Sequence, residues 1–133
     1  MKKLFIILIV FLCLPSWAVE ENQIQQTAQP PITSPQNINF ENCTKIFNVN
    51  NEKLFYLTLA SISANRFNID EIQTTNGYAI FTVNRRKYLA TVAKIDNNNS
   101  ILKITPCDNI YYFPYGILSN TFKYIDLNLK ASI

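Results

Sequence analysis

One stretch in the middle of the chain constrains the fold more than any other. An amphipathic helical pattern over residues 51–66 leads directly into an apolar run (67–74), the pair Asn76-Gly77 and a second apolar run (78–83). Asn-Gly between two such runs predicts a β-hairpin with a type I′ turn, because both central residues of that turn need a positive φ angle. A helix that feeds a hairpin buries its apolar face on the sheet, so we expect a layer of helix on sheet.

The rest of the chain predicts further strands and a second helix. Alternating apolar residues indicate strands at 44–49, 87–95 and 101–105, joined by short polar connections. Four apolar positions step by four, three and four residues and predict a second amphipathic helix: Leu118, Phe122, Ile125 and Leu129. An alternation over residues 125–129 also fits a strand. The predicted fold class is α+β, an antiparallel meander of four or five strands with two helices packed on one face.

The first 18 residues have the organisation of an export signal. Two lysines precede an uninterrupted apolar run (residues 4–14), and small residues follow up to Ala18. The run is too short to cross a hydrocarbon core, which takes roughly 20 residues. Cys13 offers a lipoprotein alternative, but a leucine stands before it where lipid attachment takes a small residue. We therefore expect a signal peptide over residues 1–18 and an exported chain, periplasmic or secreted, that does not span a membrane after cleavage.

The export signal changes the charge of the chain that remains. Without Lys2 and Lys3, ten of the twelve basic side chains remain. With nine acidic side chains, the net charge of the remaining chain is near +1. Nucleic-acid binding needs a clustered basic face, so no nucleic-acid partner is expected. Residues 19–39 are rich in Pro, Gln and Asn and predict a flexible tether, either a spacer that reaches a partner or a loose terminus. A single α+β domain is expected over residues 40–133.

Residues suited to catalysis are scarce. The chain has no histidine, the commonest general base and zinc ligand. Asp70 and Glu71 are adjacent in a predicted strand, so we expect them on opposite faces and not as a catalytic pair. Cys43 and Cys107 flank the predicted sheet, and in an exported domain such a pair predicts a disulfide, although two separate buried thiols are the alternative. The sequence predicts no enzyme, no cofactor and no metal site.

An aromatic cluster around a proline, Pro114, is the most prominent candidate for binding. It consists of Tyr111, Tyr112, Phe113 and Tyr115. The proline prevents all four from sharing one face of a regular element, so some are expected in the core and others at the surface. Tyrosine is frequent at interfaces, which makes this cluster a candidate partner surface, with core filling as the alternative.

A resemblance is carried by three runs: KIFNVNNEKLF at residues 45–55, FNI at 67–69 and NGYAI at 76–80. Together they resemble the opening of small bacterial envelope domains with β-α-β-β-β-α order, the helix-grip type found in outer-membrane assembly lipoproteins and in many periplasmic proteins. The resemblance covers residues 44–130 and includes no catalytic signature. It implies a non-enzymatic domain that docks on other envelope proteins.

Three functions remain as hypotheses. The first is an exported, non-catalytic envelope domain that binds a protein partner or acts as an accessory or scaffold factor. The second is a carrier of a small apolar ligand or lipid held between the helices and the sheet. A hydrolase is the weakest of the three, because it would need a facing pair of carboxylates with shifted pKa values in a cleft.

Overall fold

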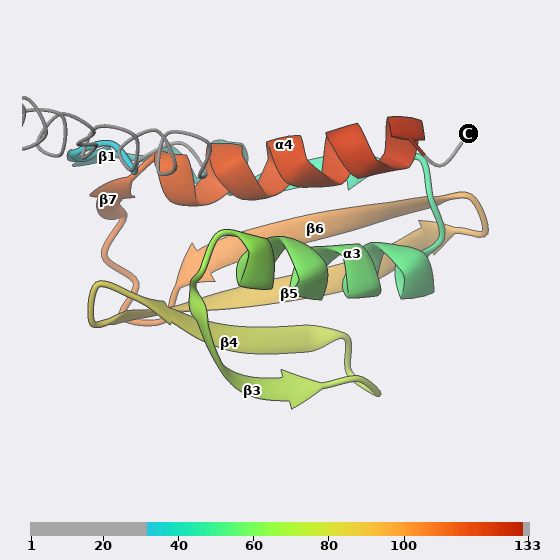
Figure 1. The fold of residues 1–133 in the computed structure, drawn as a ribbon, viewed down its shortest axis with the longest axis horizontal. Coiled ribbons are helices and arrows are strands. Elements are labelled where there is room, and N and C mark those ends of the chain that lie inside the picture. Colours follow the sequence, from blue (N-terminus) through green and yellow to red (C-terminus); the bar gives the residue numbers. More distant parts are fainter. Residues whose placement is uncertain (1–31, 132–133) are drawn as a thin grey trace, which may run out of the picture. The chain divides into compact units, whose positions relative to one another are not determined.

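The computed structural model describes residues 32–131, so the predicted signal peptide and the first part of the predicted tether lie outside the described residues. This part contains two α-helices, a five-stranded antiparallel sheet and a separate two-stranded sheet (Figure 1). The larger sheet consists of β2 (Thr44–Phe47), β3 (Asn68–Gln73), β4 (Tyr78–Val83), β5 (Arg86–Asp96) and β6 (Asn99–Pro106). The other elements are β1 (Pro35–Asn37), the 3₁₀ helix η2 (Phe40–Cys43), α3 (Asn51–Ala64), β7 (Tyr112–Pro114) and α4 (Gly116–Ala131). The predicted α+β class is confirmed.

The strand order of the larger sheet is β2-β6-β5-β4-β3, and every neighbouring pair is antiparallel. Strands β3 to β6 form the predicted meander, since each pairs with the next along the chain. β2 pairs with β6, so β2 and β3 are the two edges of the sheet. Both helices lie on the same face, as predicted (Figure 1), and the final element is the helix rather than the alternative strand.

Alternate residues of the strands point toward the helices and form the core. In β4 and β5 these are apolar residues whose side chains are buried, including Phe81 and Tyr88. Four aromatic rings follow one another through this core with centroid separations of 5.8, 5.6 and 5.4 Å: Phe67, Phe81, Tyr88 and Phe113. Such ring pairs contribute about 0.5–1.5 kcal/mol beyond the burial of their area, so this row is a major source of stability.

Local sequence explains where α3 begins and ends. The Asn50 side-chain oxygen accepts a hydrogen bond from the Lys53 N–H at 2.8 Å, the N-cap bond that asparagine commonly supplies. At the other end the Arg66 N–H donates to the Ser63 carbonyl and the Phe67 N–H to the Ile62 carbonyl. These two bonds form a Schellman cap, in which Arg66 takes the left-handed conformation with φ of 63°.

The type I′ turn lies in a different hairpin from the one predicted. Between β3 and β4 only Gly77 has a positive φ, 68°, and its N–H donates to the Thr74 carbonyl, so the connection is a longer loop. Between β4 and β5, Asn84 and Arg85 both have positive φ angles, 49° and 71°, as a type I′ turn requires. The prediction for Asn76-Gly77 is therefore wrong in turn type, because Gln73 pairs with Tyr78 and leaves four residues in the connection instead of two.

Arg85 occupies a turn position that glycine fits better. We expect Arg85→Gly to raise the free energy of unfolding by about 0.5–1 kcal/mol, because glycine adopts a positive φ without a steric penalty. Arg85→Ala removes the same charge but keeps a β-carbon, so it should give no such gain. Urea denaturation followed by circular dichroism measures both, and equal stability of the two variants would contradict this account of the turn.

The second half of the predicted tether is structured. Residues Pro35–Asn37 form β1, which pairs antiparallel with β7, and Ile38 is buried in the core cluster. A β-carbon built on Gly116 would lie 3.2 Å from the Ile32 Cα, so this glycine lets the segment pass close to the start of α4. The expectation of a flexible segment up to residue 39 is thus wrong from residue 35 onward. The reason is that pairing with β7 satisfies the backbone, although the segment itself has few apolar side chains.

Candidate functional site

The structure divides the predicted aromatic surface. Phe113 is fully buried, with its ring centroid 5.4 Å from that of Tyr88, so its assignment to a partner surface is wrong. Tyr111 is half-buried between Phe40 and Phe113. Tyr112 and Tyr115 are 52% and 40% exposed and remain available to a partner. Alternation along β7 explains the division, since residues on either side of Phe113 face away from the core.

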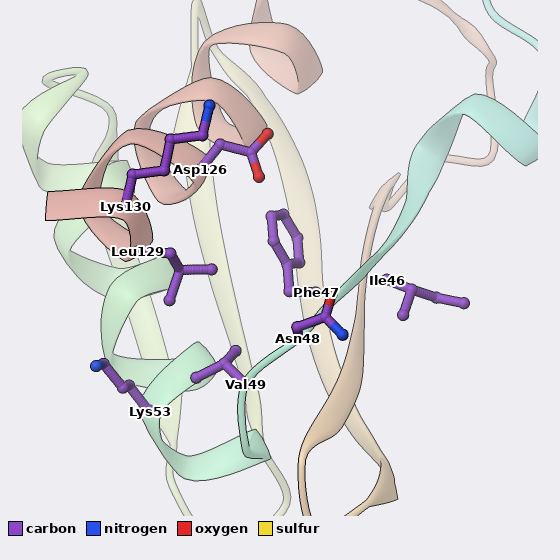
Figure 2. A pocket seen from close by; sticks show the side chains of 8 residues that line it. All are labelled: Ile46, Phe47, Asn48, Val49, Lys53, Asp126, Leu129 and Lys130. Atoms are coloured by element: carbon purple, nitrogen blue, oxygen red, sulfur yellow. The ribbon is translucent and has the colours of Figure 1, made fainter. Parts of the chain in front are cut away.

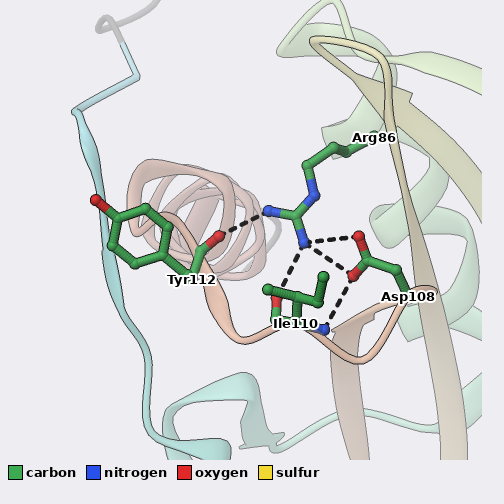
Figure 3. Close-up of polar contacts among 4 residues, drawn as sticks. All are labelled: Arg86, Asp108, Ile110 and Tyr112. Atoms are coloured by element: carbon green, nitrogen blue, oxygen red, sulfur yellow. Dashed lines mark hydrogen bonds and ion pairs between the residues drawn. The ribbon is translucent and has the colours of Figure 1, made fainter.

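Arg86 holds the segment that carries these tyrosines (Figure 3). Its guanidinium donates to the Tyr112 carbonyl at 2.7 Å, to the Ile110 carbonyl at 2.9 Å and to both carboxylate oxygens of Asp108 at 2.9 and 3.1 Å. The Ile110 N–H also donates to Asp108, at 3.0 Å. This hydrogen bond, followed by the bond from Arg86, keeps the pKa of Asp108 below its usual value. The ionised pair therefore fixes the path of the chain from β6 into β7.

The predicted disulfide is absent, and both cysteines are free thiols. Cys43 is buried in the core, which raises the pKa of its thiol, whereas Cys107 is exposed. Thr44, the residue after Cys43, pairs with Lys103, and the same register extended by one residue would bring Cys43 opposite Ile104, three residues short of Cys107. At about 3.3 Å per residue the two lie roughly 10 Å apart along the strand, beyond the reach of a disulfide. The prediction failed because it assumed that the strand ends meet, while the register is offset.

A β-bulge changes the expected arrangement of the carboxylates. The pairing of β3 with β4 shifts between Ile69 and Glu71, so that Asp70 and Glu71 do not alternate. Asp70 accepts hydrogen bonds from Thr82 and Lys87, and Glu71 accepts one from Tyr78 at 3.0 Å.

These partners place both carboxylates on the sheet face opposite the helices, which corrects the expectation of opposite faces. The hydrogen bond from Thr82, then that from Lys87, lowers the pKa of Asp70, so this group is a poor proton donor at neutral pH. Both carboxylates instead accept hydrogen bonds on the open face of the sheet, and the lowered pKa of Asp70 does not suit the general acid of a hydrolase.

An open groove runs between β2 and α4 along the edge of the sheet. One part, about 470 Å³, lies between β2 and the second half of α4 and is closed at one end by the first turn of α3 (Figure 2). The other part, about 430 Å³, lies between η2, the start of β2 and the first half of α4. Asp126 lines both parts, and its Oδ2 lies 2.6 Å from the Lys45 Nζ, so this ion pair crosses the middle of the groove.

One face of α4 supplies the helical wall of this groove. Tyr115 precedes the first turn, and the lining residues within α4 lie about one helical turn apart and therefore share a face: Ser119, Phe122 and Lys123, then Asp126, then Leu129 and Lys130. Phe47 points from β2 toward α4, while Ile46 points away from the groove (Figure 2). The Phe47 ring meets that of Phe122 with centroids 6.3 Å apart, which forms an apolar floor.

The groove joins residues that the sequence did not connect. Tyr115 was predicted as part of a partner surface, but the lysines of α4 were not, and neither was the exposed edge of β2. A helical pattern shows which α4 residues share a face, whereas the strand order that leaves β2 at the edge depends on long-range pairing. Tyr112 lies outside the groove lining, in β7.

Large side chains fill the space between the helices and the sheet. The largest fully buried residues are Tyr88, Phe81, Phe113, Leu54, Ile62 and Leu102. The groove between β2 and α4 lies outside this packed interior, and the carrier hypothesis stays a prediction. Among residues 32–131, no group of three or more Cys, Asp or Glu side chains is placed to hold a metal ion.

Neither helix of the described residues combines the length and apolarity needed to span a membrane. Comparison with known proteins gives no relative from which a function could be transferred: no protein-family model, no curated protein and no solved structure matches this chain.

Proposed function

We propose that this chain is an exported, non-catalytic domain of the cell envelope that binds a protein partner as an accessory or scaffold factor. The observation that carries the proposal is the open groove beside the free edge of β2, because a sheet edge next to a helix is a common place for protein recognition. Export is supported by the amino-terminal sequence, and the absence of histidine supports a non-catalytic role.

The exposed aromatic residues agree with partner binding. Tyr115 lies at one end of the groove, and Tyr112 is exposed on the neighbouring β7. Tyrosine contributes a large contact area with little loss of side-chain entropy on binding, so both residues suit an interface. The Arg86 hydrogen bonds hold the segment before α4 in place, which prepares Tyr112 for contact.

A blocked groove should prevent partner capture. We expect Ser119→Arg in the full exported chain to reduce recovery of crosslinked partners from envelope extract at least about fivefold, because the long side chain fills the groove. Leu127→Arg is the matched control, since Leu127 is an exposed α4 residue outside the groove lining and the change adds the same charge. Quantitative mass spectrometry of the captured proteins measures the effect. Equal recovery by both variants would count against the groove as the binding site.

A further inference from the structure

We infer that the groove binds an extended, acidic peptide segment of a partner, which adds as a new strand to the free edge of β2. This inference rests on the proposed function, because it names the chemistry of the partner that the groove accepts. Three features of the groove carry it: the unpaired backbone of β2, the regular wall formed by α4, and the excess of lysines.

The backbone of β2 is available for pairing on one side. Among residues 32–131, β2 pairs only with β6, so alternate residues of this edge strand direct their N–H and C=O groups away from the sheet. Four residues at about 3.3 Å each give an edge of roughly 13 Å, enough to pair with a segment of four to five residues. An extended peptide satisfies these groups with main-chain hydrogen bonds, independently of its sequence.

The face of α4 that lines the groove determines which side chains of the bound peptide fit there. Successive side chains of a strand point to opposite sides, so every second side chain of the peptide would face α4. On that side the groove offers the partly buried Leu129, beside the almost fully buried rings of Phe47 and Phe122. A small apolar side chain in the peptide fits this floor, and neighbouring positions reach the polar rim.

The charge of the rim selects acidic side chains. Four lysines line the groove, Lys45, Lys53, Lys123 and Lys130, against two carboxylates, Glu41 and Asp126. Lys45 already pairs with Asp126. Within the described part of the chain, the other three lysines form no ion pair with a carboxylate. Acidic side chains on the peptide would therefore meet uncompensated positive charge, which favours association and selects against basic segments.

Lysines at a sheet edge also have a protective use, because they discourage unwanted strand pairing. If the lysines only protect the edge, no peptide should add as a strand to β2. If our inference is right, an acidic peptide should do so. The experiment below separates the two.

The test uses the full exported chain, labelled with ¹⁵N, and capped peptides of about eight residues. The probe alternates glutamate and valine; one control peptide alternates lysine and valine, and a second control is the acidic probe with N-methyl groups on alternate residues. We expect chemical-shift changes and slowed hydrogen exchange at the amides of Thr44–Phe47 with the acidic probe only. N-methylation removes the main-chain donors that strand addition needs, so it should weaken binding at least about tenfold.

Matched variants test the role of charge. The double variant Lys123→Glu/Lys130→Glu should weaken the acidic probe at least about tenfold, whereas Arg85→Glu/Lys94→Glu, with the same change in net charge at exposed residues outside the groove lining, should stay within about twofold. Circular dichroism spectra serve as the control that both variants are folded.

Three outcomes overturn the inference. Absence of binding, equal binding of the lysine peptide, or undiminished binding of the N-methylated probe rules out strand addition by an acidic segment. If Ser119→Arg abolishes partner capture while the acidic probe does not bind, the groove still binds a protein and only the chemistry of the occupant is wrong. If the probe binds while Ser119→Arg leaves capture unchanged, the captured partners use another surface.

Discussion

Replacing Phe113 by alanine is expected to lower the free energy of unfolding by about 3–5 kcal/mol, the usual cost of removing a buried phenylalanine ring. The side chain is 0% exposed and ends the row of aromatic rings that begins at Phe67. Its loss leaves a cavity beside Tyr88 that the rigid sheet cannot collapse to fill. Urea denaturation followed by far-ultraviolet circular dichroism at neutral pH measures the change.

The neighbouring residue provides the control for this prediction. Tyr112 is 52% exposed, so Tyr112→Ala should change the free energy of unfolding by no more than about 0.5 kcal/mol. A small effect of Phe113→Ala, or a large effect of Tyr112→Ala, would show that the alternation along β7 is reversed. That result would return Phe113 to the candidate partner surface.

Arg86→Met is expected to lower the free energy of unfolding by about 2–3 kcal/mol. Methionine keeps the length and apolar stem of the side chain, but the carbonyls of Ile110 and Tyr112 lose their charged donor, and Asp108 loses its ion-pair partner. Part of the loss is offset by water, because the Arg86 side chain is 29% exposed. Arg85→Met removes the same charge from the adjacent turn and should have less than a quarter of the effect by urea denaturation.

The pH dependence of stability provides a second measurement for the same change. The Ile110 N–H and then Arg86 lower the pKa of Asp108 in the folded state. A carboxylate with a lowered pKa contributes stability that is fully present above its unfolded pKa, about 4, and is lost as the pH falls through the folded value. Arg86→Met removes one of these causes, so its stability should fall less steeply than that of the unaltered chain below about pH 4. Parallel curves for the two proteins would contradict the role given to this ion pair.

Much of the fold is predictable from local sequence patterns. The period of the apolar residues placed both helices and every strand of the larger sheet, and Asn50 marks the start of α3, as local capping chemistry predicts. The failures concern long-range geometry. Nothing in residues 35–37 shows that they pair with a strand about 75 residues later, and the register that separates Cys43 from Cys107 depends on how β2 meets β6.

The candidate site was less predictable than the fold. The aromatic cluster pointed to Tyr112 and Tyr115, but alternation along a three-residue strand was needed to place Phe113 in the core. The groove lysines are separated by up to 85 residues and come together only because β2 stands at the edge of the sheet beside α4. Their helical spacing on α4 was visible in the sequence, and so was the strand at 44–49, but not that this strand lies opposite α4.

The bulge in β3 has a consequence for assembly. Endless stacking of identical copies would require both edges of each molecule, β2 and β3, to pair with a neighbour. The irregular pairing at Asp70 and Glu71 twists that second edge and places two negative charges there, so it is a poor partner for another copy. Only one side of the sheet is therefore competent for extension, and the domain should form complexes of fixed stoichiometry rather than fibres.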